Sequence, residues 1–262
     1  MREPCQFVCG IAIASFLNLA ASVPAADLGS VEKGRQLFAV NCALCHGERG
    51  DGKGQAAGRL QTAPRDLTKG VYKFRSTGSS RPPTDSDLTR TISLGIPGTA
   101  MVPQGDLDEA EIRSLVDFIK TLSNKFSENP NPRPLPIPLP PANNAAALSA
   151  GRKVYLENGC VECHGTRARG DGPSASKLSI KPADLTRRPL KSGATAKDIV
   201  RTILTGLDGT SMPSYHQVLA EEKIWLLAYY IESLGKAPVL TDDERIGREI
   251  LRQIRAAVPP RQ

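Results

Sequence analysis

The chain contains few histidines, methionines and aromatic residues. Its 262 residues include three histidines, three methionines and six cysteines, and aromatic residues make up 5%. It also lacks the alternating apolar pattern of β-strands, and no nucleic-acid-binding motif accompanies its net charge of +7. A β-fold and a nucleic-acid partner are therefore disfavoured, and we expect an all-α fold. The basic excess is spread over both halves and indicates only a weak preference for acidic partner surfaces.

The N-terminal apolar run is too short for a membrane anchor. It covers residues 7–21, where a span needs roughly 20 apolar residues, and Asn18 interrupts it. The run follows Arg2 and leads into small residues, with a cleavage site expected near Ser22 to Ala26. Residues 1–26 are therefore interpreted as a cleaved secretory signal peptide. This predicts a periplasmic protein for which membrane association is not required.

Four of the six cysteines lie in two copies of the pentapeptide C-x-x-C-H, which is the attachment signature of c-type haem. The copies are CALCH at residues 42–46 and CVECH at residues 160–164. In such a motif the two sulfurs form thioethers with the two vinyl groups of one porphyrin, and the histidine binds the iron. The sequence predicts two covalently bound haem c groups, attached at Cys42, Cys45, Cys160 and Cys163, with His46 and His164 as iron ligands.

Two other uses of a C-x-x-C pair, a zinc site and a thiol–disulfide enzyme, fit the sequence less well. A zinc site built from both pairs would leave the two adjacent histidines unexplained, and a thiol–disulfide enzyme would need a βαβ pattern that is not visible. Cys5 and Cys9 lie in the signal peptide, so the mature chain is expected to keep no spare thiol and no disulfide. That fits the oxidising compartment in which bacteria attach haem covalently.

Each haem motif has a matching candidate for the sixth iron ligand. Apart from the initiator, the two methionines are Met101 and Met212, and both lie in Gly-Thr-x-Met segments of Gly/Pro-rich loops. A thioether suits haem iron, and His/Met ligation raises the reduction potential. Met101 and Met212 are therefore predicted to bind iron. His216 is an alternative sixth ligand of the second haem, although an ordinary loop residue is the favoured interpretation.

The haem motifs belong to an internal repeat that a proline-rich stretch divides. Residues 129–141 carry proline at nearly alternate positions, which favours an extended, semi-rigid spacer. The first copy contains extra residues, expected within residues 69–81. The predicted division is a signal peptide at 1–26, a first haem domain at 27–128, a linker at 129–142, a second haem domain at 143–237 and a helical tail at 238–262. Each half is expected to fold alone.

Each copy is predicted to form three main helices connected by Gly- and Pro-rich loops. The first helix begins near Ser30 in the first copy and near Ser149 in the second, and it carries the haem motif at its end. The second helix covers residues 85–94 in the first copy and 196–204 in the second. The third covers residues 108–122 and 220–234, respectively. The tail at residues 241–254 reads as a further amphipathic helix, with a capping box formed by Thr241 and Glu244. We expect this helix to pack against the second domain.

With these motifs the chain resembles class I cytochromes c joined as a tandem dihaem cytochrome. The resemblance covers roughly residues 30–124 and 148–235 and depends on CALCHG and CVECHG, followed by GTAM and GTSM. It implies two all-α haem domains with the axial pairs His46/Met101 and His164/Met212. It also implies that a proline carbonyl holds the other ring nitrogen of each axial histidine, with Pro64 and Pro182 as the candidates.

The function that these features predict is one-electron transfer between redox partner proteins. The chain would act as a free carrier or as the cytochrome subunit of a larger system, such as a molybdenum enzyme or a terminal oxidase, and neither iron would bind a substrate. The alternative is a dihaem cytochrome c peroxidase-like enzyme, which needs an iron with an open or displaceable sixth position. Two matched methionine loops argue against it, but ligand switching on reduction leaves it open. Thiosulfate oxidation at a cysteine-ligated haem would require a spare cysteine.

Overall fold

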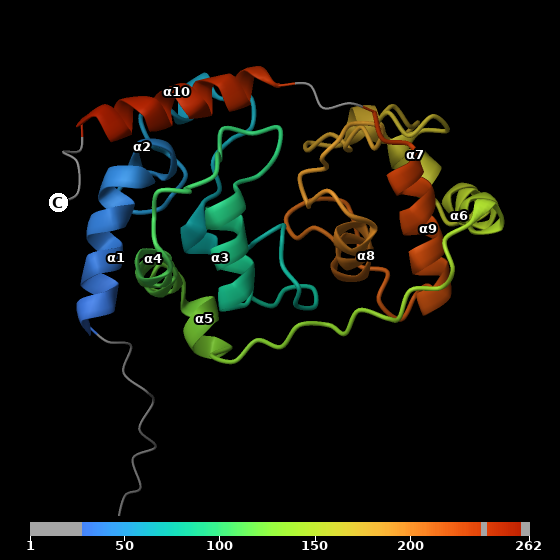
Figure 1. Ribbon diagram of the computed structural model, residues 1–262, viewed down its shortest axis with the longest axis horizontal. Helices are drawn as coiled ribbons and strands as arrows, with labels where there is room; N and C mark the ends of the chain where they lie inside the picture. Colours follow the sequence, from blue (N-terminus) through green and yellow to red (C-terminus); the bar gives the residue numbers. More distant parts are fainter. Residues whose placement is uncertain (1–27, 237–239, 258–262) are drawn as a thin grey trace, which may run out of the picture.

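The computed structural model describes residues 28–236 and 240–257, which form two helical lobes and a long C-terminal helix (Figure 1). In chain order the α-helices are α1 (Leu28–Asn41), α2 (Ala43–His46), α3 (Asp85–Leu94), α4 (Glu109–Thr121), α5 (Asn124–Glu128), α6 (Ala145–Glu157), α7 (Cys160–His164), α8 (Ala196–Thr205), α9 (Glu221–Ser233) and α10 (Asp242–Ala257). Three short 3₁₀ helices cover Ala57–Arg59, Leu67–Lys69 and Ala175–Lys177. Within the described ranges there is no β-strand, which confirms the all-α prediction.

Each lobe has its own apolar core, built on the same helix pair. In the first lobe α1 packs against α4, and the rings of Phe38 and Phe118 lie 5.2 Å apart. In the second lobe α6 packs against α9, and the rings of Tyr155 and Tyr230 lie 5.5 Å apart. The apolar stripes that predicted the helices are therefore the faces that meet in the two cores.

Three of the four second and third helices begin at a capping residue, and the exception is α9, which starts after Ala220 without a side-chain cap. Thr84, Asp108 and Thr195 each form a capping box with the third residue of the helix that follows. The predicted first helix of each copy is divided in two. In the first lobe Cys42 separates α1 from α2, and in the second lobe residues 158 and 159 separate α6 from α7. Of the latter pair, Gly159 has a φ of +77°. The short helix α5 was not predicted.

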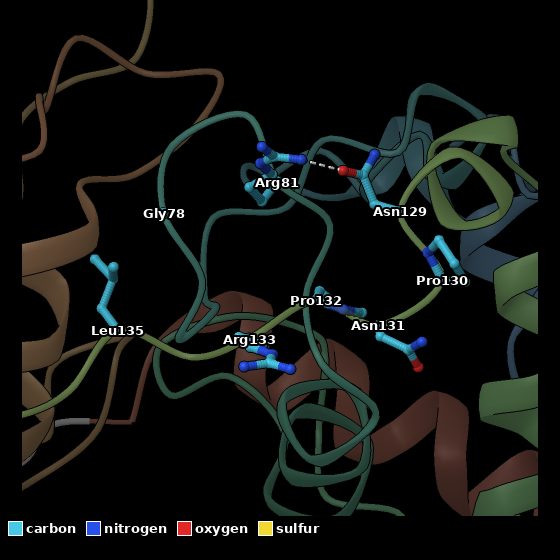
Figure 2. A pocket seen from close by; sticks show the side chains of 8 residues that line it. All are labelled: Gly78, Arg81, Asn129, Pro130, Asn131, Pro132, Arg133 and Leu135. Carbon is cyan, nitrogen blue, oxygen red and sulfur yellow. Dashed lines mark hydrogen bonds between the residues drawn. The ribbon is translucent and has the colours of Figure 1, made fainter.

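The proline-rich stretch is bound to both lobes and is more than a spacer. Figure 2 shows its start beside the first lobe, where Arg81 donates to the side chain of Asn129. Further along, the carbonyls of Pro138 and Pro141 accept from Trp225 Nε1 and the Tyr229 hydroxyl, both at 2.9 Å, in the second lobe. Proline has no N–H to donate, so the prolines attach through their carbonyls. Leu135, between them, donates its N–H to the Ser76 carbonyl of the first lobe at 2.8 Å.

The two lobes also contact each other directly through a buried arginine. The side chain of Arg75 has no exposed surface, and its Nη2 lies 2.8 Å from Asp208 Oδ1 and 3.0 Å from the Thr205 carbonyl. The N–H of Ser80 donates to the other oxygen of Asp208, at 2.9 Å. Arg75 and Ser80 lie within residues 69–81, where the first copy was expected to carry its extra residues. That segment therefore joins the first lobe to the second.

The prediction that the tail packs against the second domain is wrong. The tail does form the predicted helix, and Thr241 and Glu244 cap it reciprocally. However, α10 crosses back over the first lobe and contacts α1 (Figure 1). Its carboxylates bind backbone N–H groups of the first lobe, and Arg255 pairs with Asp106. Proximity along the chain therefore did not identify the surface that this helix covers.

None of the helices in the described ranges combines the length and the hydropathy that a bilayer crossing requires. The predicted signal peptide at residues 1–26 lies outside the described residues.

Candidate haem sites

Each C-x-x-C-H motif forms one short helix that exposes its ligands to the same side. The His46 N–H donates to the Cys42 carbonyl at 2.8 Å, so the motif closes one helical turn and brings the Cys42 and Cys45 side chains near each other. Helix α7 repeats this arrangement with Cys160 and Cys163. All four thiols are half-buried and free. Two thiols one turn apart beside an imidazole have the geometry that double thioether attachment needs.

The histidines of the two motifs are oriented by backbone carbonyls, but not by the predicted ones. Nδ1 of His46 lies 3.0 Å from the Arg65 carbonyl oxygen, and Nδ1 of His164 lies 2.9 Å from that of Ala183. The prediction of Pro64 and Pro182 is thus wrong by one residue in both lobes. The proline carbonyls face glycines instead: a Cβ on Gly52 would lie 2.9 Å from the oxygen of Pro64.

The protonation state of both imidazoles suits iron binding. Burial lowers the pKa of His46 and of His164, and the hydrogen bond to the carbonyl opposes this shift only in part. A neutral ring that donates its Nδ1–H to a carbonyl keeps its lone pair on Nε2. That nitrogen is then available to a metal.

The alternative uses of the cysteine pairs do not fit the structure. Burial raises the pKa of the Cys42 thiol to about 12 and that of Cys160 to about 11, whereas a thiol–disulfide enzyme needs a lowered value. Helices α2 and α7 lie in different lobes, so the two pairs do not meet in one zinc site (Figure 1). In the described parts of the chain, no group of three or more His, Cys, Asp or Glu side chains could hold a metal ion.

The two methionines lie in loops with the same hydrogen bonds. The N–H of Met101 donates to the Thr99 hydroxyl at 3.1 Å, and that hydroxyl donates to the Ile96 carbonyl at 2.8 Å. The loop of Met212 repeats this pattern with Thr210 at 3.1 Å. The conserved spacing of Gly-Thr-x-Met between the two copies therefore has a structural cause, since the threonine closes the turn that presents the methionine.

His216, the alternative sixth ligand, follows Met212 in the second lobe. It is half-buried, and its backbone N–H donates to the Ser214 hydroxyl at 3.2 Å. Ser214 in turn donates to the Leu204 carbonyl at 2.5 Å, so this turn is tied to the end of α8. His216 thus lies on a loop that is fixed separately from the turn of Met212.

A buried tyrosine tests whether the residues of the first lobe fit a haem. The Tyr72 hydroxyl is buried and has no hydrogen-bond partner among the described residues, and burial raises its pKa. Leaving such a group unpaired costs about 1–3 kcal/mol. A haem propionate would give it an acceptor, and the nearby Arg65 guanidinium would offset the negative charge. The residues present therefore fit the group. The sequence does not indicate Tyr72, because no local signal marks an unpaired hydroxyl.

The two sites are linked through Arg65. Its carbonyl accepts from His46, and its side chain lies beside the Met212 loop of the other lobe. A Cβ placed on Gly209 in that loop would lie 3.4 Å from Nη1 of Arg65 and 3.4 Å from Cγ1 of Val71. The loop that presents Met212 is thus packed against the segment that orients His46.

Both lobes match known family models. Residues 31–123 match the model of cytochrome c, and residues 146–231 match the model described as cytochrome C oxidase, cbb3-type, subunit III. A chain of the Kuenenia stuttgartiensis reducing HAO-like protein complex Kustc0457/Kustc0458 is 38% identical, with a TM-score of 0.75. The similarity covers 78% of this chain and 96% of that chain.

Similar sequences include subunits of an oxidase. The cbb3-type cytochrome c oxidase subunit CcoP of Azospirillum brasilense is 30% identical over 208 residues, which cover 77% of this chain and 61% of that protein. Subunit FixP of Bradyrhizobium sp. (strain ORS 278) is 28% identical over 213 residues, which cover 78% and 60%. This chain therefore spans about three fifths of the length of these relatives. The matches confirm two haem-binding domains and two covalently bound haem c groups.

Proposed function

We propose that this chain, which belongs to the tandem dihaem cytochromes c, transfers single electrons between redox partner proteins in the periplasm. When bound, each haem supplies a one-electron ferric/ferrous couple. The observation that carries the proposal is that the two lobes present the same full set of ligands. Each lobe has two thiols on one helical turn, a histidine oriented by a carbonyl, and a methionine on a loop closed by threonine.

The proposed site residues are those of the two motifs and the two loops. Cys42, Cys45, Cys160 and Cys163 would attach the porphyrins, and the axial pairs would be His46/Met101 and His164/Met212. An iron with both axial positions filled has no place for a substrate. This favours a non-enzymatic electron carrier over the peroxidase-like alternative, which needs one displaceable ligand.

The interface between the lobes supports a relay through both sites. The buried pair of Arg75 and Asp208, together with the pair of Arg90 and Asp198 at 3.1 Å, holds the lobes in one arrangement. The rate of electron transfer falls steeply with the distance between two haems. A fixed arrangement of the lobes would therefore keep the rate of transfer between the two haems constant. The proposed division has a first haem domain at residues 27–128, a linker at 129–142, a second haem domain at 143–237 and a tail at 238–262.

The partner proposed is a larger redox complex. The relatives are named as subunits of a cbb3-type oxidase, and the similar structure is a chain of an HAO-like complex. A subunit of a terminal oxidase or of an HAO-like complex is therefore favoured over a free carrier, and a molybdenum enzyme stays a further candidate. Export directed by the signal peptide at residues 1–26 would deliver the chain to the periplasm, where it could bind such a complex.

A redox titration of the purified holoprotein, followed by visible and near-infrared absorbance, tests the function. Both ferric haems should be low-spin and show the weak near-infrared band of sulfur–iron ligation, and hydrogen peroxide should be turned over slowly. Met101→Ala or Met212→Ala should make the affected haem high-spin, whereas His216→Ala should change neither haem. A wild-type protein that is high-spin at one haem and reduces peroxide rapidly would support the peroxidase instead.

A further inference from the structure

We infer that α10 is a positioning element for the first haem site alone. It joins the segment that orients His46 to the loop that carries Met101, and through both it sets how firmly Met101 is held at the iron. The inference rests on the proposed His46/Met101 ligation. It goes further because it assigns a function in that site to a helix that follows the second domain.

On the histidine side, α10 binds through Asp243. This carboxylate is 4% exposed, and its two oxygens accept from the N–H groups of Gln61 and Thr62, both at 2.9 Å. These two residues lie shortly before Arg65, whose carbonyl accepts from His46. A buried carboxylate with two N–H donors is a strong attachment, because hydrogen bonds to a charged group are about twice as strong as neutral ones. Helix α10 therefore fixes the backbone that leads to the partner of the histidine.

On the methionine side, α10 binds through Glu244 and Gly247. Glu244 Oε1 accepts from the Gly98 N–H at 2.8 Å, at the start of the Gly-Thr-Ala-Met loop. Gly247 lies against Ala100, the residue before Met101, and a Cβ on Gly247 would lie 2.4 Å from the Ala100 carbonyl oxygen. The helix can approach the loop this closely only because this position has no side chain. Figure 1 shows α10 lying across the first lobe, where these contacts are made.

The second site is built differently. There the equivalent loop, at residues 209–212, lies beside the side chains of Arg65 and Val71. A displacement of α10 should therefore loosen Met101 and leave Met212 in place. A helix that only raised overall stability would lower the unfolding midpoint without changing one haem selectively.

The test is Gly247→Ala in the full-length holoprotein, with imidazole as the probe that competes with methionine for ferric iron. To read one haem at a time, the substitution is made in a Met212→His background, where the first haem alone keeps a methionine, and in a Met101→His background, where the second does. Arg252→Ala is the matched control, because its side chain is 74% exposed on the outer face of the same helix.

In the Met212→His background, Gly247→Ala should raise the imidazole affinity of the first haem about tenfold, or about 1.4 kcal/mol. It should also weaken the sulfur–iron band and lower the first reduction potential. In the Met101→His background it should leave the second haem unchanged. Asp243→Ala should act in the same direction as Gly247→Ala, and Asp243→Asn less strongly, because the amide keeps one acceptor oxygen.

The inference is overturned if Gly247→Ala and Asp243→Ala leave the first haem as it is in Arg252→Ala, or shift both haems equally. A wild-type protein without a sulfur–iron band at the first haem would have a different meaning. In that case the proposed Met101 ligation itself would be wrong, and the inference would fall with it.

Discussion

Removing the buried arginine between the lobes should uncouple them. Arg75→Met keeps much of the side-chain volume and removes the guanidinium, which binds Asp208 at 2.8 Å and the Thr205 carbonyl at 3.0 Å. Breaking one partner of a buried ion pair commonly costs about 3–5 kcal/mol, because the other charge is left uncompensated. Here Asp208 is 19% exposed and keeps the Ser80 N–H, so a lower cost of about 2–3 kcal/mol is expected.

The loss of stability is measured by denaturant unfolding of the holoprotein, followed separately by helix content and by haem absorbance. The wild type should unfold in one transition at the same midpoint by both probes, and Arg75→Met should shift the midpoint down or separate the probes. Arg113→Met is the control, because that side chain is 66% exposed on α4, and it should change stability by less than about 0.5 kcal/mol. If Arg75→Met behaves like Arg113→Met, the buried pair does not hold the lobes together and the reasoning is refuted.

Three further predictions concern the haems and the division of the chain. A pyridine haemochrome assay should give two haems per chain, and acid–acetone extraction should leave the colour with the protein; colour in the solvent would contradict covalent attachment. Tyr155→Phe, which copies Phe38 of the first repeat, should lower stability by about 1 kcal/mol in thermal unfolding, because it removes the 2.6 Å hydrogen bond to the Gly165 carbonyl. The fragments 27–128 and 143–262, expressed separately with haem maturation, should each bind one haem. They should also associate when mixed, because α10 belongs to the second fragment and docks on the first. Elution of the mixture as two separate species in gel filtration would contradict this association.

The features that could be predicted from sequence are those whose cause is local. The haem motif is a chemical requirement at fixed spacing, and the helices at residues 85–94 and 109–121 follow from apolar period and from the caps at Thr84 and Asp108. The capping box of α10 was predicted for the same reason. Each of these signals lies within one or two helical turns of the residues it controls.

The features that were missed depend on contacts between distant segments. Nothing near Asp243 indicates that its partners are backbone groups far earlier in the chain, so the tail was assigned to the nearer domain. The one-residue error in the carbonyls that face His46 and His164 has a similar origin. Which carbonyl faces His46 depends on how the loop through Arg65 turns as it returns to α2, and no spacing rule encodes that turn.

Several of the residues that hold the two lobes together lie in segments that the two copies of the repeat do not share. The two copies agree in the haem helices, the Gly-Thr-x-Met loops and the main helix pairs, which are what a single haem domain needs. They differ in residues 69–81, which supply Tyr72 and Arg75, and in the tail, which supplies Asp243 and Gly247. The segments outside the repeat therefore fix the environment of the first haem and the position of the second lobe. The Met212 loop lies against the side chains of Arg65 and Val71. A substitution of either side chain is therefore expected to reach the second haem, whereas a displacement of α10 at the Met101 loop should affect the first haem alone.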